Sequence, residues 1–540
     1  MTDAIADDRL QRIDALFSGW AKGRQPGACL AVVSGGEVVL KKCYGLADLE
    51  HQVPLSSSST FYILSITKQI CATAVLMLEA EGRLGLDDEV QAHLPELPRY
   101  EHRLTLHHLL TNTSGVRDEL TLLLYAGIGF EQAVTRDQML DLVYRQRSLD
   151  FPPGTRCRYS NSNFLLASKV VERVSGESFR DFLARRIFTP LGMGSTRLCS
   201  DNSELAPGLA RPYSRYGGES WHKNVVLVGV SGEGGILSSL DDMLLWLGNH
   251  RRNRLVPADL IARLSTRPRM ANGTLGSYAL GLRVSEYRGR RIFTHGGGWP
   301  GYTHELCWLP DDDLGILLFT NRDDTRSIQL TRSIAAAWLG LEPPMPKAGA
   351  IAPERLAGRY FDRGEGYTMV LSAVDGRLLA DVIDFKGGLE QVSTDRFESV
   401  YGQHAMSLRL LGTTVNGAPK IEAVLDGGHT LVFERPGPVA LTRAELAAHA
   451  GTYATPELPV AYRIELSDGG LSLRLDRSFP DPGRQKLTPL GGDLFSVALP
   501  FYHQPAVGTF RFLRGAGRAI EGLRINIGRV TNLRMARQPG

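Results

Sequence analysis

An internal repeat in the last third of this 540-residue chain constrains its fold more than any other feature. The segment Leu356-Ala357-Gly358-Arg359-Tyr360 recurs as His449-Ala450-Gly451-Thr452-Tyr453, and Asp375-Gly376-Arg377-Leu378 recurs as Asp468-Gly469-Gly470-Leu471. Both pairs lie about 93 positions apart, and two matched segments at one spacing indicate a duplicated structural unit. Apolar and polar residues alternate through both copies, with Gly and Asp between the runs. The sequence therefore predicts two small antiparallel β-barrels in tandem.

The region before the repeat, about the first 340 positions, instead mixes helical and strand patterns. The two regions meet at 341–349, where three prolines prevent the preceding helix from continuing. We therefore predict three domains: an α+β domain at residues 1–342, followed by β-barrel domains at residues 350–437 and 441–540.

Strand patterns lie at both ends of the first domain. Residues 28–39 are typical of a hairpin around Gly35-Gly36, and residues 303–309 and 314–320 form a second pair of strand-like runs. The middle of the domain is mostly helical in pattern. We expect the two ends to share one antiparallel sheet, with the helical middle packed against it.

The composition excludes several classes of protein. Hydrophobic residues make up 43%, charged residues 22%, and the formal net charge is +3, which predicts a globular protein without a nucleic-acid or membrane partner. The N-terminus lacks the basic and apolar regions of a secretory signal. The six cysteines have no close pair in the sequence, so we expect neither a disulfide framework nor a zinc site. A cytoplasmic location without metal or organic cofactor is expected.

A serine and a lysine three positions apart, Ser65 and Lys68, begin a helical pattern that ends near Gly82. Residues at this spacing share one face of a helix. A serine hydroxyl becomes a nucleophile when a nearby base accepts its proton, and the free N–H groups of a helix N-terminus can stabilise an oxyanion. We therefore predict Ser65 as nucleophile and Lys68 as its proton partner. The alternative is a capping serine beside a solvated lysine.

A second candidate pair, Tyr159 and Asn161, follows Pro152-Pro153-Gly154 and precedes a helical run from Phe164. The pair is expected on a loop at the start of a helix, where the tyrosine can move protons and Asn161 can hold a substrate amide. The alternative is an N-cap asparagine beside a core tyrosine.

A third candidate segment is His295-Gly296-Gly297-Gly298, placed at the end of a strand at 291–294. Residues without side chains let a substrate backbone lie along a strand edge, and the N–H of Gly298 is expected to donate to the oxyanion beside that of Ser65. The alternative is a tight turn after a structural histidine. An esterase oxyanion loop is excluded because no G-x-S-x-G elbow follows.

The three segments, S-x-x-K at 65–68, Y-x-N at 159–161 and H-x-G at 295–297, resemble in order and spacing the motifs of class C β-lactamases and D-Ala-D-Ala carboxypeptidases, the penicillin-recognising serine hydrolases. The resemblance covers about residues 10–335. It implies a β-lactamase/transpeptidase-like domain, with a five-stranded antiparallel sheet flanked by helices and a helical lobe. It also implies an acyl-enzyme mechanism on Ser65, with His295 among the catalytic residues.

The addition of two barrels and the histidine of the third motif resemble the D-aminopeptidase group of this superfamily. That likeness implies removal of N-terminal D-residues from small peptides, amides and esters. It also implies that a loop of the second barrel, at 478–485, enters the cleft, where Asp481 is our candidate partner for the substrate ammonium group. The alternatives are a promiscuous esterase, amidase or weak β-lactamase on the same scaffold, and a penicillin-binding sensor without turnover. A homodimer is a possible assembly.

Overall fold

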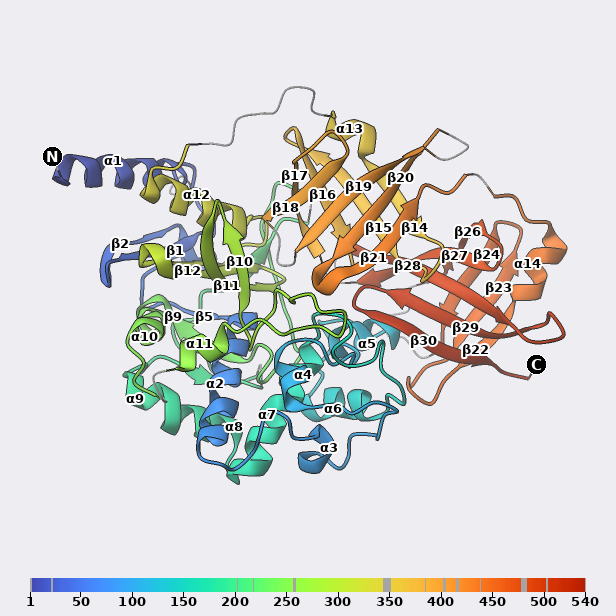
Figure 1. Ribbon diagram of the computed structural model, residues 1–540, viewed down its shortest axis with the longest axis horizontal. Helices are drawn as coiled ribbons and strands as arrows, with labels where there is room; N and C mark the ends of the chain where they lie inside the picture. Colours follow the sequence, from blue (N-terminus) through green and yellow to red (C-terminus); the bar gives the residue numbers. More distant parts are fainter. Residues whose placement is uncertain are drawn as a thin grey trace.

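The computed structural model of the chain contains three packed units (Figure 1). It describes residues 2–20, 23–201, 203–216, 218–255, 259–342, 351–383, 385–401, 405–413, 417–437, 439–476, 483–501 and 504–539. Most of the predicted boundary at 341–349, namely residues 343–349, lies outside these residues. The predicted limits of the three domains therefore stay predictions.

The first unit is built on an antiparallel sheet with the order β10-β11-β12-β13-β1-β2. These strands are β1 (Ala28–Ser34), β2 (Glu37–Tyr44), β10 (Arg283–Tyr287), β11 (Arg290–Trp299), β12 (Tyr302–Leu309) and β13 (Leu314–Thr320). Strand β1 pairs with β13, so the two ends of the unit share one sheet, as predicted. The sheet has six strands rather than the five that the resemblance implied, because β10 adds a hairpin to β11.

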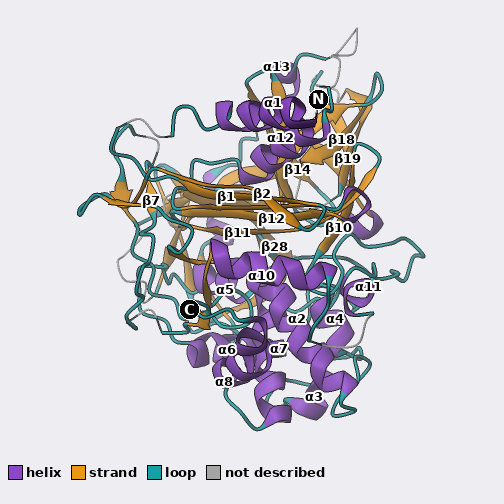
Figure 2. Cartoon of the chain, turned by 90° about the vertical axis from the view of Figure 1, so that its left-hand side faces the viewer, coloured by secondary structure: helices purple, strands orange, loops and turns teal. Residues whose placement is uncertain are grey.

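Helices cover both faces of this sheet (Figure 2). Helices α1 (Thr2–Ala15) and α12 (Ser327–Leu339) lie on one face, and α2 (Thr67–Ala80) and α10 (Leu240–Arg251) lie on the other. Because successive side chains of a strand point to opposite faces, Leu30 packs toward α1 and α12, whereas Ala31 packs into the core that contains α2.

A helical lobe extends beyond α2 and surrounds α7, which is buried along most of its length. The lobe contains α3 (Val90–His93), α4 (Leu106–Leu110), α5 (Glu119–Tyr125), α6 (Arg136–Tyr144), α7 (Asn161–Ser175), α8 (Phe179–Leu183), α9 (Thr189–Leu191) and α11 (Leu260–Leu264). Short strands form three further small sheets, β3-β4, β5-β9-β6 and β7-β8. They are β3 (Leu46–Asp48), β4 (Val53–Pro54), β5 (Thr60–Tyr62), β6 (Arg197–Leu198), β7 (Tyr213–Ser214), β8 (His222–Lys223) and β9 (Ile236–Ser239). Among the described residues, no helix is long and apolar enough to cross a membrane.

The second unit is a closed antiparallel barrel, preceded by helix α13 (Pro353–Leu356). Its strands are β14 (Gly358–Asp362), β15 (Thr368–Val374), β16 (Arg377–Val382), β17 (Phe385–Gln391), β18 (Arg396–Tyr401), β19 (Met406–Thr413), β20 (Pro419–Leu425) and β21 (His429–Glu434). Each strand pairs with its sequence neighbours, and β14 closes the barrel on β21. The prediction of a small antiparallel barrel is confirmed for this unit.

The third unit begins with helix α14 (Arg443–His449) and forms a curled sheet with the order β25-β24-β23-β22-β30-β29-β28-β27-β26. Its strands are β22 (Gly451–Ala454), β23 (Tyr462–Ser467), β24 (Gly470–Leu475), β25 (Gln485–Lys486), β26 (Thr488–Gly491), β27 (Leu494–Phe501), β28 (Gln504–Arg514), β29 (Ile520–Ile527) and β30 (Val530–Arg537). The two edge strands, β25 and β26, are separated by one residue in the chain, so the sheet is nearly closed into a second barrel.

The repeat found in the sequence corresponds to the same structural corner in both barrels. Gly358 and Gly451 begin the first strand of each barrel with φ angles of 151° and 153°, a conformation that favours glycine. Two residues later, the hydroxyl groups of Tyr360 and Tyr453 each donate a hydrogen bond to the backbone carbonyl four residues earlier, at 2.7 and 2.8 Å. The duplication seen in the sequence is therefore also present in the structure.

Buried arginines of the first unit join it to both barrels. The completely buried guanidinium of Arg117 donates to Asp150 at 3.0 Å and to Glu457 of the third unit at 2.5 Å. Arg158 donates to Thr531 of the third unit at 2.7 Å and to Tyr367 of the second at 2.8 Å. Because a buried charge is costly without partners, these contacts fix how the three units dock.

We expect Arg117→Met to lower the free energy of unfolding by about 3–5 kcal/mol, because Asp150 loses its nearest cation in a buried site. Arg145→Met is the matched control: Arg145 is largely exposed and pairs with Asp141 one helical turn away, so its loss is expected to cost less than about 1 kcal/mol. Urea denaturation of the full chain measures both values. Equal effects for the two variants would contradict the structural role of Arg117.

Candidate active site

Ser65 lies in a short 3-10 helix, η1 (Leu64–Ile66), that leads directly into α2. Leu64, just before it, has a φ angle of 54°, a left-handed conformation that costs free energy for a residue with a Cβ. Such strain is concentrated at functional sites. The side chain of Ser65 is partly exposed and lines a cavity, and its Oγ accepts a hydrogen bond from Lys68 Nζ at 3.2 Å. Ser65 and Lys68 therefore lie on one face of the helical segment, as their spacing predicts.

The amine of Lys68 is completely buried and has three acceptors. Lys68 Nζ donates to the backbone carbonyl of Glu233 at 2.6 Å, to Asn161 Oδ1 at 2.8 Å and to Ser65 Oγ at 3.2 Å. Three acceptors match the three hydrogens of an ammonium group. The solvated lysine of the alternative interpretation is excluded by this burial.

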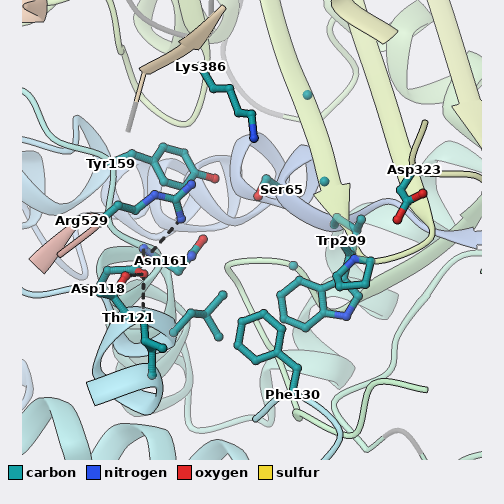
Figure 3. Close-up of a pocket in the computed structure, with 18 of the residues that line it drawn as sticks. Ser65, Asp118, Thr121, Phe130, Tyr159, Asn161, Trp299, Asp323, Lys386 and Arg529 are labelled. Carbon is teal, nitrogen blue, oxygen red and sulfur yellow. Dashed lines mark hydrogen bonds and ion pairs between the residues drawn. The ribbon is translucent and has the colours of Figure 1, made fainter. Parts of the chain in front are cut away.

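Tyr159 and Asn161 occupy the loop and first residue of α7, as predicted. The Tyr159 ring is buried, and its centroid lies 4.8 Å from Lys68 Nζ. On the side of the third unit, the guanidinium of Arg529 lies 4.7 Å from the same centroid (Figure 3). The tyrosine is thus placed between the candidate base and a barrel residue.

Asp118 fixes the orientation of Asn161 and was missed in the sequence. Its Oδ1 accepts hydrogen bonds from the backbone N–H of Asn161 at 2.8 Å and from Asn161 Nδ2 at 2.9 Å. Its Oδ2 caps α5 through the backbone N–H and hydroxyl of Thr121. The amide oxygen of Asn161 is therefore directed at Lys68. An N-capping aspartate before a helical run was the available signal.

The placement of His295 corrects the sequence interpretation. Strand β11 does not end at Thr294 but continues to Trp299, because Gly296, Gly297 and Gly298 pair with β12. The buried ring of His295 lies 2.8 Å from the backbone carbonyl of Gly296 through Nδ1 and 2.8 Å from the Tyr278 hydroxyl through Nε2. A carbonyl can only accept, so Nδ1 carries a hydrogen, and in the neutral ring Nε2 then accepts from the Tyr278 hydroxyl.

The glycines of β11 allow the strand to approach the serine turn. A Cβ atom at Gly297 would lie 2.5 Å from the backbone oxygen of Ile63, a distance that no side chain tolerates. A Cβ at Gly298 would meet no described atom within 4 Å, and Gly298 lines the cavity. Glycine is thus needed at 297 for close packing, while position 298 leaves room for a substrate.

The cavity beside Ser65 has a volume of about 880 Å³ and is walled by all three units (Figure 3). The rings of Phe130 and Trp299 stack, with their centroids 4.9 Å apart, and form an apolar wall of the cavity. The second unit contributes Ile383 and Lys386, and the third contributes Ala506, Gly528 and Arg529. In Figure 3 the side chain of Lys386 points toward Ser65.

The loop of the second barrel that was expected in the cleft lies partly outside the described residues. Asp481 falls in the segment 477–482, which is not described, so its role stays a prediction. Arg484, which follows, forms an ion pair with Glu465 at 2.9 Å. Among the described residues, the part of this barrel that reaches the cavity includes Gly528 and Arg529, in the turn between β29 and β30.

Glu119, beside Asp118, is a completely buried carboxyl group. Ser162 Oγ lies 2.6 Å from both the backbone carbonyl of Arg117 and Glu119 Oε2. The Ser162 hydroxyl has one hydrogen for these two oxygens, so a protonated Glu119 is the form that satisfies both contacts. Burial, followed by the carboxyls of Asp118 and Glu233, raises the pKa of Glu119 well above its ordinary value. In its protonated form Glu119 adds no negative charge beside Asp118.

We expect Glu119→Gln to be stabilising relative to the wild type above about pH 5. The unfolded chain releases this proton near pH 4.3, whereas the folded protein keeps it, so this group's contribution to the free energy of unfolding falls as pH rises. The difference between variant and wild type should widen from pH 5 to pH 7, by up to about 1.4 kcal/mol per unit. Urea titrations measure it, with exposed Glu101→Gln as control. A difference independent of pH would contradict a protonated Glu119.

The sequence model of the Beta-lactamase family matches residues 11–337. A D-aminopeptidase of Cereibacter sphaeroides (strain KD131) is 28% identical over 97% of this chain and 96% of its own length. A D-aminopeptidase of Gluconobacter oxydans is 27% identical over 95% of this chain and 96% of its own. The crystal structure of a D-stereospecific amidohydrolase from Streptomyces sp. is 25% identical, with a TM-score of 0.52 over 62% of this chain and 99% of that one.

Proposed function

The chain belongs to the beta-lactamase family, and we propose that it is a serine hydrolase that removes N-terminal D-amino acids from small peptides, amides and esters. The observation that carries the proposal is the hydrogen-bonded group of Ser65, Lys68 and Asn161 at a cavity walled by all three units. The similarity to proteins named D-aminopeptidase extends through both barrels. It therefore supports D-aminopeptidase substrates over those of relatives that consist of the first unit alone.

In the proposed reaction, Ser65 Oγ attacks the carbonyl carbon of the substrate while Lys68 Nζ accepts the serine proton. For this step the hydrogen bond between the two groups is reversed, with the Ser65 hydroxyl donating to a neutral Lys68 amine. The backbone N–H groups of Ser65 and Gly298 stabilise the resulting oxyanion. Tyr159 delivers a proton to the leaving nitrogen or oxygen, the bond to the leaving group breaks, and an acyl-enzyme ester remains on Ser65.

Water then releases the acyl group. One proton of the water passes to the same amine and tyrosine pair, the hydroxide adds to the ester carbonyl, and Ser65 regains its hydrogen as the D-amino acid leaves. Asn161 contacts the substrate amide and keeps Lys68 in place. His295 contacts the Tyr278 hydroxyl, and its expected place among the catalytic residues stays a prediction. The chemistry requires only these side chains and water.

We expect Ser65→Ala to lower kcat/KM by at least about 1,000-fold, because the acyl acceptor is lost with little change in packing. Ser220→Ala is the matched control, since Ser220 and Lys223 have the same spacing without a helix. Hydrolysis of D-alanine p-nitroanilide measures both. Loss of activity in the Ser220 variant alone would overturn the assignment of Ser65.

The stereochemistry of the substrate is tested with D- and L-alanine p-nitroanilides. The D-anilide is expected to react at least about 10-fold faster, a difference of about 1.4 kcal/mol in transition-state free energy. N-acetylation of the D-anilide should slow the reaction, because an aminopeptidase binds the free ammonium group. Equal rates on all three compounds would replace the proposal by a general amidase or esterase, and turnover of a β-lactam alone would replace it by a β-lactamase.

Three further expectations accompany the proposal. Asp481 as the acid that faces the ammonium group, a homodimeric assembly and a cytoplasmic location all stay predictions from the sequence. Light scattering on the purified protein tests the assembly, since a homodimer has twice the chain mass of 59.2 kDa.

A further inference from the structure

Two cysteines that are fourteen positions apart in the sequence lie side by side in the sheet. Cys29 of β1 is the direct partner of Cys43 of β2 in the antiparallel register. The two Sγ atoms are 2.7 Å apart, with the Cys43 thiol donating to Cys29. Both are thiols in this structure, and neither takes part in the proposed hydrolysis.

The backbone at this position suits a disulfide bond. Directly opposite residues of an antiparallel pair have Cα atoms about 4.5–5.5 Å apart, within the range of about 4.4–6.8 Å that disulfides span. A disulfide needs a sulfur distance of about 2.05 Å, so the two sulfur atoms have to approach by roughly 0.7 Å. Side-chain rotation alone provides such a movement.

The two thiols have different surroundings, which gives each a distinct part in oxidation. Cys29 is completely buried, and burial raises its pKa well above the ordinary value. Cys43 is only partly buried, and the hydrogen bond with Cys29 lowers its pKa. The charged groups that face the pair are Lys41 and Asp241, which form an ion pair at 2.9 Å. Cys43 is therefore the thiol that a small oxidant reaches.

We propose that Cys29 and Cys43 form a reversible disulfide when the protein meets a peroxide. The Cys43 thiolate attacks one oxygen of hydrogen peroxide, the O–O bond breaks, and a sulfenic acid and a hydroxide ion are formed. The hydroxide takes up the proton that Cys43 released on ionisation and becomes water. The Cys29 sulfur then attacks the Cys43 sulfur, the S–O bond breaks, and the hydroxyl leaves as a second water with the Cys29 proton. The two sulfurs are oxidised by two electrons in total, and the peroxide is reduced.

The bond would tie the edge of the central sheet to its interior. Strand β2 is the last strand of the sheet, and its partner β1 lies between β2 and β13. Oxidation also removes the hydrogen that Cys29 donates to the backbone oxygen of Ser56 at 3.3 Å. The site is independent of the proposed hydrolase function, because its chemistry uses no residue of the cavity.

The test treats the reduced full-length protein with a small excess of hydrogen peroxide, followed by thiol titration and peptide mapping without reduction. Free thiols are expected to fall from six to four, with one cross-linked peptide pair that joins Cys29 to Cys43 and disappears on addition of dithiothreitol. Cys43→Ser should keep all five remaining thiols. Cys199→Ser, the matched control, should still lose two thiols by the same cross-link.

Retention of six free thiols in the wild type would overturn the proposal. So would a cross-link between other cysteines, or conversion of Cys43 to a sulfinic acid without a bond to Cys29. Turnover of the D-anilide by the reduced protein is measured in parallel, so failure of this proposal is distinguished from failure of the hydrolase assignment.

Discussion

Burial of the Lys68 amine is the constraint on which the candidate site depends. A buried lysine is costly unless its donors are satisfied, and here the acceptors come from distant parts of the chain. Ser65 belongs to the turn before α2, Asn161 begins α7, and Glu233 lies on the loop before β9. One side chain thus requires that three segments converge. Ser65 is placed at this junction, where its hydroxyl has a proton partner and faces the cavity.

The barrels contact residues that directly precede site residues in the sequence. Arg117 precedes Asp118, which orients Asn161, and Arg158 precedes Tyr159. Each buried arginine therefore joins a barrel to a residue adjacent to the site. Because the barrels also supply cavity residues such as Arg529, their docking determines the shape of the space beside Ser65. We infer that the barrels select the substrate, whereas the first unit carries out the chemistry.

Local patterns in the sequence predicted the features that local interactions determine. The repeat predicted both barrels, and the helical stripe after Ser65 predicted α2. The features that were missed depend on contacts across the chain. Pairing with β12 extends β11 through its glycines, Asp118 reaches Asn161 across the lobe, and Lys386 and Arg529 enter the cavity only after the units dock. Single-sequence patterns carry no information about such long-range partners.

The central claim, that an acyl group is transferred to Ser65, is tested most directly by trapping that intermediate. The protein is mixed with a slowly hydrolysed ester of a D-amino acid, quenched in acid and digested, and the modified peptide is sequenced by mass spectrometry. The account predicts one acyl group per chain, attached to Ser65 and absent after longer incubation. An adduct on Ser220, or hydrolysis of the ester without any adduct under conditions where turnover is slow, would contradict it.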